Sequence, residues 1–141
     1  MKVRNAAVAD AEAIAVLLGE LGYPATTEEA AVRLAALQKI KDNVAIVAED
    51  EGRVLGVATV DELTVLHASG KVAQLSMLVV ASSARRTGVG RALVEAAEAW
   101  ARYRGCVRMV VTSNERRTDA HAFYRRLGWE HTGRRFSKTL R

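Results

Sequence analysis

Apolar residues recur at helical spacing in two segments near the start of the chain. In the first segment, apolar side chains three or four positions apart form one face of a helix from Asp10 to about Glu20, which Gly22 ends. In the second, Thr26 and Glu29 have the spacing of a capping box, which predicts that another helix begins there. The apolar positions of the two helices are Ile14, Leu17, Leu18 and Leu21, then Val32, Leu34, Leu37 and Ile40.

Valine-rich runs in the same half of the chain predict strands. Two of these runs flank Asp50-Glu51-Gly52, a turn sequence, and we therefore expect an antiparallel hairpin. A further run follows the break at Ser69-Gly70. The expected strands are residues 3–8, 44–48, 54–60 and 72–80.

The second half of the chain begins with its clearest helix, residues 88–104, which Gly105 stops. Its apolar face carries Leu93, Ala96, Ala97, Trp100 and Ala101. The other elements expected here are a strand at 107–111, a helix at 119–127 capped by Thr118 and closed by Gly128, and one or two strands from Trp129 onward.

The resulting order is β-α-α-β-β-β-α-β-α-β. Some strands are joined by tight hairpins and others by helices, which predicts a mixed sheet with helices on its faces, in the α/β (α+β) class. With 141 residues and no linker-like stretch, we expect one domain over residues 1–141.

Composition limits the classes of protein to which the chain can belong. Half of the residues are hydrophobic and 26% are charged, values typical of a folded domain, and no apolar run is long enough to span a bilayer. The chain opens without a signal-peptide core, so we expect a cytoplasmic protein. Cys106 is the single cysteine, and none of the three histidines has another at i,i+4, so we expect neither a disulfide nor a metal site.

Charge is divided unevenly along the chain. Residues 1–84 carry 7 Lys/Arg against 11 Asp/Glu, whereas residues 85–141 carry 14 against 5. The basic segment should attract an anion, with nucleic acid, a membrane surface or a phosphorylated cofactor as candidates. The alternative is an arginine-rich surface that simply faces water.

The most informative segment is Arg85-Arg86-Thr87-Gly88-Val89-Gly90-Arg91, between an expected strand and the long helix. Glycines let the backbone approach a ligand, and the free N–H groups of a first helical turn favour an anion. Together with three arginines, this predicts a pyrophosphate site, although a glycine-softened loop would look the same. The pattern is neither a P-loop nor the dinucleotide fingerprint.

Residues 80–93 resemble the acyl-CoA motif of the GNAT acetyltransferase superfamily, and residues 120–129, with Phe123-Tyr124 and Gly128-Trp129, resemble its second signature. The two motifs have the family's order and the predicted topology covers the whole chain. The C-terminal segment is most similar to small-molecule N-acetyltransferases of the aminoalkylphosphonate and aminoglycoside kinds. The resemblance therefore implies a GNAT-like fold and acetyl-CoA as co-substrate, and it makes a homodimer a state to test.

The resemblance also implies roles for individual residues. Tyr124 would stand next to the sulfur of the coenzyme as an acid, and Asn114 is a candidate coenzyme contact, although it lies three positions before the family's asparagine, where Arg117 stands. The backbone of one strand would bind the pantetheine arm, and the glycine-rich segment would bind the pyrophosphate. These coenzyme-binding residues are Leu78, Val79 and Val80, followed by Arg85, Arg86, Thr87, Gly88, Val89, Gly90 and Arg91.

The general base is less clear, because Gln74, Ser76 and Met77 occupy positions near which many family members have a glutamate. Asp61 and Glu62 end a long strand, and alternation lets only one of them face a given side. A carboxylate facing the cleft could attract an amine or accept its proton, so Glu62 is our second catalytic candidate. The alternative is a solvated strand end.

Three functions remain after this reading. The first is an acetyl-CoA-dependent N-acetyltransferase that acts on the primary amine of a small molecule. The second is the same fold acting on a protein N-terminus or lysine. The third is a non-catalytic module that binds nucleic acid or senses CoA. Because the coenzyme motif accounts for a cluster of three arginines and only two phenylalanines and three tyrosines could stack on bases, we expect no nucleic-acid partner and no membrane.

Overall fold

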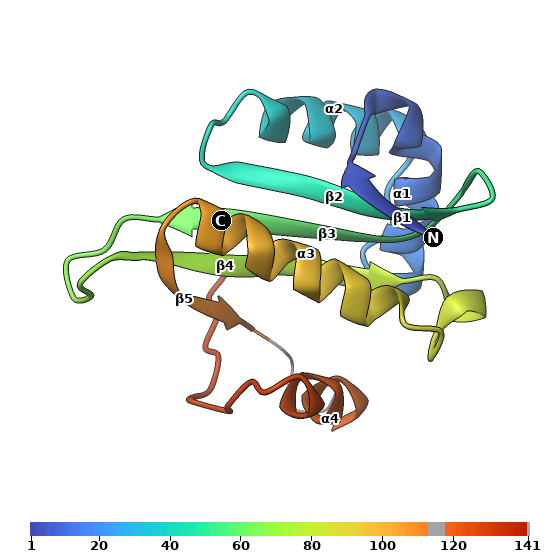
Figure 1. The fold of residues 1–141 in the computed structure, drawn as a ribbon. Coiled ribbons are helices and arrows are strands. Elements are labelled where there is room, and N and C mark those ends of the chain that lie inside the picture. Colours follow the sequence, from blue (N-terminus) through green and yellow to red (C-terminus); the bar gives the residue numbers. More distant parts are fainter. Residues whose placement is uncertain (113–117, 141) are drawn as a thin grey trace. The chain divides into compact units, whose positions relative to one another are not determined.

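The computed structural model describes residues 1–112 and 118–140, and the chain divides into two compact units, Met1–Val110 and Val111–Arg141. The second unit contains α4 (Thr118–Arg126). The elements before it are β1 (Lys2–Asn5), the 3-10 turn η1 (Val8–Asp10), α1 (Ala11–Leu21), α2 (Thr27–Gln38), β2 (Asn43–Asp50), β3 (Arg53–Leu63), β4 (Lys71–Val80), the 3-10 turn η2 (Ser82–Ala84), α3 (Val89–Tyr103) and β5 (Cys106–Val111) (Figure 1).

The strands form one sheet in the order β1-β2-β3-β4-β5, and β1 to β4 pair antiparallel in sequence. The connection from β4 to β5 runs through α3, and β5 points in the same direction as β4 (Figure 1). The sheet is therefore mixed, as the combination of hairpins and helical connections predicts. No helix among the described residues is long and apolar enough to cross a membrane.

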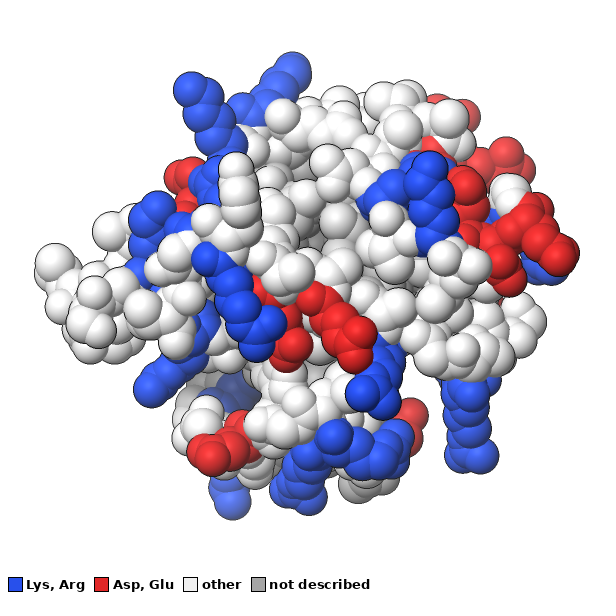
Figure 2. Space-filling model, in the orientation of Figure 1, with Lys and Arg blue, Asp and Glu red and all other residues white. Residues whose placement is uncertain are grey.

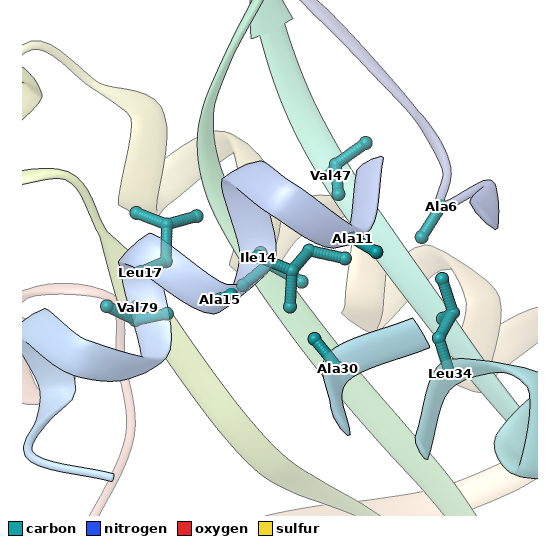
Figure 3. Packing of buried hydrophobic residues seen from close by; sticks show 10 residues of the cluster. Ala6, Ala11, Ile14, Ala15, Leu17, Ala30, Leu34, Val47 and Val79 are labelled. Carbon is teal, nitrogen blue, oxygen red and sulfur yellow. The ribbon is translucent and has the colours of Figure 1, made fainter. Parts of the chain in front are cut away.

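The two faces of the sheet are covered by different helices. Val57 belongs to a buried cluster with residues of α1 and α2. A Cβ atom built on the preceding residue, Gly56, would lie 2.9 Å from Leu93 Cδ1 and 3.1 Å from Val89 Cγ1, both on α3. Because neighbouring residues of a strand point to opposite faces, α1 and α2 cover one face and α3 the other. The first cluster consists of Ala6, Ala11, Ile14, Ala15, Leu17, Ala30, Leu34, Val47, Val57 and Val79 (Figure 3).

Short-range signals produce the local structure that the sequence predicts. The capping box at the start of α2 is formed: Glu29 N–H donates to Thr26 Oγ1, and Thr26 N–H donates to Glu29 Oε1, both at 3.0 Å. The β2–β3 hairpin turns at Glu51 and Gly52, whose φ angles are 49° and 76°. Positive φ at both central residues is the type I′ arrangement, which matches the twist of the flanking strands.

The first and the last of the predicted strands differ most from the structure. The first strand ends at Asn5, and Val8 begins a 3-10 turn in which the Asp10 carboxylate accepts a 2.7 Å hydrogen bond from Ala7 N–H. The strands predicted from Trp129 onward are not formed: residues 129–140 contain no strand, and Phe136 and Leu140 are each 92% exposed. A strand needs a partner for its backbone groups, and this polar segment buries too little apolar surface to dock on one.

Candidate active site

The end of β4 carries the residues expected to contact the pantetheine arm. Leu78, Val79 and Val80 pair with Ala58, Val57 and Gly56 of β3, and Val79 is buried. Two residues earlier, the register shifts, because Thr59 pairs with Met77 whereas Val60 pairs with Leu75. The bulge bends β4 just before these positions.

The segment after β4 joins η2 to the first turn of α3. Thr87 Oγ1 donates a hydrogen bond to the carbonyl of Ala84, which folds the segment back on itself. Arg86 and Gly88 have φ angles of 65° and 89°, in the left-handed region that a residue with a side chain rarely adopts. Gly88 is the N-cap of α3 and has no side chain with which to cap it. The N–H groups of the first turn therefore have no side-chain acceptor at Gly88, and the positive end of the helix dipole adds to their attraction for an anion.

The three arginines of this segment are not equivalent. Arg91, in the first turn of α3, donates a 2.9 Å hydrogen bond from Nε to Glu95 Oε1. Acidic side chains lie between basic ones over α3 (Figure 2). Arg85 and Arg86 are exposed, and neither has a hydrogen bond or ion pair within the described part of the chain. Arg85 and Arg86 are therefore the two side chains available to a phosphate, while Val89 is buried and Gly90 follows it inside the helix.

Glu62 occupies a different environment from the one expected of a base. Its side chain is 4% exposed, and its carboxylate accepts hydrogen bonds from Lys71 Nζ at 2.9 Å and from the Arg104 guanidinium at 2.7 Å. These two cations lower the pKa of Glu62 to about 2, and the hydrogen bond from Arg104 has the larger effect. A carboxylate with such a pKa is a weak proton acceptor at neutral pH, and both of its oxygens already have donors, so the site does not suit a general base.

Sequence reasoning did not identify the partners of Glu62. Arg104 also donates to Asp42 Oδ1 at 3.0 Å, and its guanidinium carbon lies 5.4 Å from the centre of the Trp100 ring. Trp100 and Arg104 are four positions apart, a spacing that places them on consecutive turns of a helix. This spacing could have predicted the contact between Trp100 and Arg104, and the sequence offers no other signal for it. The neighbouring Asp61 is half-buried and has no ion pair within residues 1–112 and 118–140.

Tyr124 lies in the last turn of α4, in the second unit. Its ring centre is 5.2 Å from that of Phe123 and 5.5 Å from that of Trp129, and its carbonyl accepts hydrogen bonds from the N–H groups of Leu127 and Trp129. The hydrogen bonds hold the backbone of Tyr124 at the helix end, and the rings of Phe123 and Trp129 pack near its ring. His121 stacks on His131 at 6.0 Å, a contact that the sequence did not suggest. Asn114, the other residue expected from the resemblance, lies outside the described residues.

Comparison with known proteins extends these observations. The family model described as "Acetyltransferase (GNAT) family" matches residues 12–129. The aminoalkylphosphonate N-acetyltransferase of Salmonella typhimurium is 29% identical over 145 residues, covering 99% of this chain and 91% of that enzyme. The aminoglycoside N(6')-acetyltransferase type 1 of Klebsiella aerogenes is 52% identical over 56 residues, and this match spans only 38% of the chain and 37% of that enzyme.

Solved structures share the fold over nearly the whole chain. A Bacillus halodurans protein described as a transcriptional regulator superposes with a TM-score of 0.92 at 24% identity, covering 99% of both chains. The aminoglycoside N-acetyltransferase AAC(6')-Iy, solved in complex with CoA, superposes with a TM-score of 0.84 at 20% identity and the same coverage. At these identities the likeness establishes the fold, and the mixed α/β class predicted from the sequence is confirmed.

Proposed function

Because this chain belongs to the GNAT acetyltransferase family, whose donor substrate is acetyl-CoA, we propose that it transfers an acetyl group to the primary amine of a small molecule. The observation that carries the proposal is the segment from Ser82 to Gly88, which leads into a helix whose N-cap has no side chain. The full-length similarity to an aminoalkylphosphonate N-acetyltransferase supports a small acceptor over a protein.

In this proposal the coenzyme is held mainly by backbone groups. The N–H groups of residues 86–91 bind the pyrophosphate, and the exposed guanidinium groups of Arg85 and Arg86 add positive charge. Thr87 contributes its amide, because its hydroxyl is already bonded to Ala84. The backbone of Leu78, Val79 and Val80 binds the pantetheine arm in the manner of an added strand, beside the bulge in β4.

The proposed chemistry is direct attack on the thioester. The unprotonated amine forms a bond to the carbonyl carbon while the backbone N–H of Leu78 stabilises the charge that develops on the oxygen. The carbon–sulfur bond then breaks, and the Tyr124 hydroxyl protonates the departing thiolate. The proton of the amine passes to water and Tyr124 regains its own from solvent, so that an amide and a free thiol are the products. Glu62 takes no part, because Lys71 and Arg104 occupy its carboxylate.

The acceptor is proposed to be a small primary amine, including amines that also carry a phosphonate or carboxylate group. Asp61 and the exposed Tyr23 are the candidates for contacts with the cationic amine, and Arg135 is the candidate for an anionic group on the same molecule. Both named relatives act on small molecules that contain amines, which is consistent with this acceptor class.

A free-thiol release assay with acetyl-CoA tests the proposal. The panel should contain aminoalkylphosphonates, aminoglycosides, simple amines, and peptides with a free N-terminus or a lysine, with Gly88→Asp as a control that lacks the coenzyme site. We expect thiol release with at least one small amine. Faster turnover of the peptides than of every small amine would favour acetylation of proteins. No release with any acceptor, together with steeply salt-dependent DNA binding, would favour a non-catalytic module. The cytoplasmic location and the homodimer stay predictions.

A further inference from the structure

A glutamate of α1 is bonded to the segment that we assign to the coenzyme. Glu20 Oε1 accepts a 2.9 Å hydrogen bond from the hydroxyl of Ser82, and Glu20 Oε2 accepts one of 3.3 Å from the backbone N–H of Ser82. The two residues are 62 positions apart in the chain. Both carboxylate oxygens of Glu20 therefore accept hydrogen bonds from Ser82, the first residue of η2, and η2 is the turn with which the segment begins.

The position of Glu20 on its helix is unfavourable for a carboxylate. Glu20 lies in the last turn of α1, where the partial charge of the helix end is negative, and no basic residue lies in that turn. Ser82 N–H, in contrast, begins a 3-10 turn and has no acceptor inside it. The contact satisfies this donor and gives the carboxylate of Glu20 two hydrogen-bond donors from Ser82.

The rest of the segment is held by its own backbone and by β3. Ala81 N–H donates to the Leu55 carbonyl at 2.8 Å, Ala84 N–H donates to the Ala81 carbonyl at 2.9 Å, and Thr87 Oγ1 donates to the Ala84 carbonyl. Glu20 is a side chain from outside this segment that forms two hydrogen bonds to it. It thus links the segment to α1.

We propose that Glu20 is a positioning residue for acetyl-CoA. By fixing Ser82, it holds the start of the turn from which the left-handed residues Arg86 and Gly88 follow, and so it keeps their N–H groups in the arrangement that binds the pyrophosphate. This inference rests on the proposed function of the segment. It assigns Glu20 to the coenzyme and not to the acceptor amine, so loss of Glu20 should change the affinity for acetyl-CoA and leave the chemical step unchanged.

A double-mutant cycle on Glu20 and Ser82 tests the inference, with the Kd of acetyl-CoA measured by calorimetry. Glu20→Ala should weaken binding by about 3- to 10-fold, the value of one or two exposed hydrogen bonds, and Ser82→Ala by somewhat less. The double variant should be no weaker than Glu20→Ala, because the two changes remove the same interaction. Glu20→Gln keeps one acceptor oxygen and should lie between the wild type and Glu20→Ala. The kcat at saturating acetyl-CoA should stay within about twofold of the wild type in every variant.

Glu12→Ala is the matched control, since Glu12 is an exposed glutamate of the same helix, and it should leave the Kd unchanged. An unchanged Kd in both Glu20→Ala and Ser82→Ala would overturn the inference. So would a lower kcat with an unchanged KM for acetyl-CoA, which would assign Glu20 to the acceptor. Should Glu20→Ala fail to fold, Ser82→Ala and Glu20→Gln still decide the question. Gly88→Asp separates this failure from that of the proposed function: if it too binds acetyl-CoA normally, the segment is not the coenzyme site.

Discussion

The guanidinium of Arg104, at the end of α3, donates a 2.7 Å hydrogen bond to the carboxylate of Glu62, near the end of β3. Lys71 at the start of β4 completes the group, so that one buried carboxylate joins the end of α3 to β3 and β4. Because both oxygens of Glu62 are bonded to cations, we expect this carboxylate to stabilise the fold and not to act as a base. Each of the two cations stabilises the buried carboxylate, and removal of the carboxylate would leave both cations without this partner.

Replacement of Glu62 should therefore affect stability more than catalysis. Glu62→Ala leaves Lys71 and Arg104 without their shared partner and should lower the free energy of unfolding by about 1–3 kcal/mol, less than for fully buried pairs because both cations are partly exposed. Urea denaturation measures this loss. Asp42→Ala removes the exposed partner of Arg104 and should change stability by about 0.5 kcal/mol or less. A 100-fold lower kcat in folded Glu62→Gln would restore Glu62 as the base.

Stability should fall in acid through the same group. The pKa of Glu62 is about 2 in the folded protein, against 4.5 for an unperturbed glutamate, so the folded state holds fewer protons than the unfolded state between these values. The contribution of Glu62 is fully present above about pH 4.5 and is lost as the pH falls toward 2. Asp10, whose pKa is lowered mainly by Arg4, acts in the same direction. The difference in unfolding free energy between wild type and Glu62→Gln, measured from pH 6 downward, should shrink across this window, and a difference that stays constant would contradict the assignment.

A charged substitution at Gly88 tests the proposal that the segment from Ser82 to Gly88 binds the coenzyme. No atom of the described residues lies within 4 Å of a Cβ built there, so the Cβ itself meets no obstacle, whereas the φ of 89° opposes a side chain. Gly88→Asp should weaken acetyl-CoA binding by more than about 100-fold because its carboxylate meets the pyrophosphate. Gly88→Asn has almost the same shape, tolerates the left-handed conformation and carries no charge, so it should retain much more affinity. Arg86→Ala should have a smaller effect than Gly88→Asp, since the amide remains. Calorimetry with CoA compares the three, and equal affinities for Asp and Asn would argue against a phosphate at this position.

Tyr124→Phe tests the proposed acid. The change keeps the ring, and with it the contacts to Phe123 and Trp129, and removes only the hydroxyl. We expect kcat at saturating acetyl-CoA to fall by about 100-fold, within the usual range for general acid catalysis, with little change in the Kd of CoA. A wild-type kcat in this variant would leave Tyr124 with a packing role alone.

Structural features that depend only on residues a few positions apart were predicted correctly from the sequence. Thr26 and Glu29 form their capping box, and Glu51 and Gly52 form the hairpin turn. The first turn of α3 begins at Gly88 as the glycine pattern indicates. In each case the interacting groups lie on the same short segment, so the residues themselves select the backbone conformation. The fold class followed from the order of such local elements.

The sequence by itself thus determined the elements up to α4 and their order, and it predicts a segment suited to a phosphate. Only the tertiary structure decided what the carboxylates do: Glu62 meets Arg104 from 42 positions away, and Glu20 meets Ser82 from 62 positions away. It also decided that residues 129–140 form no strand, although their pattern had suggested one. The physical reason is the same in all three cases. The partner of a charge or of a strand edge comes from a distant part of the chain, and packing, which no local pattern encodes, selects that partner.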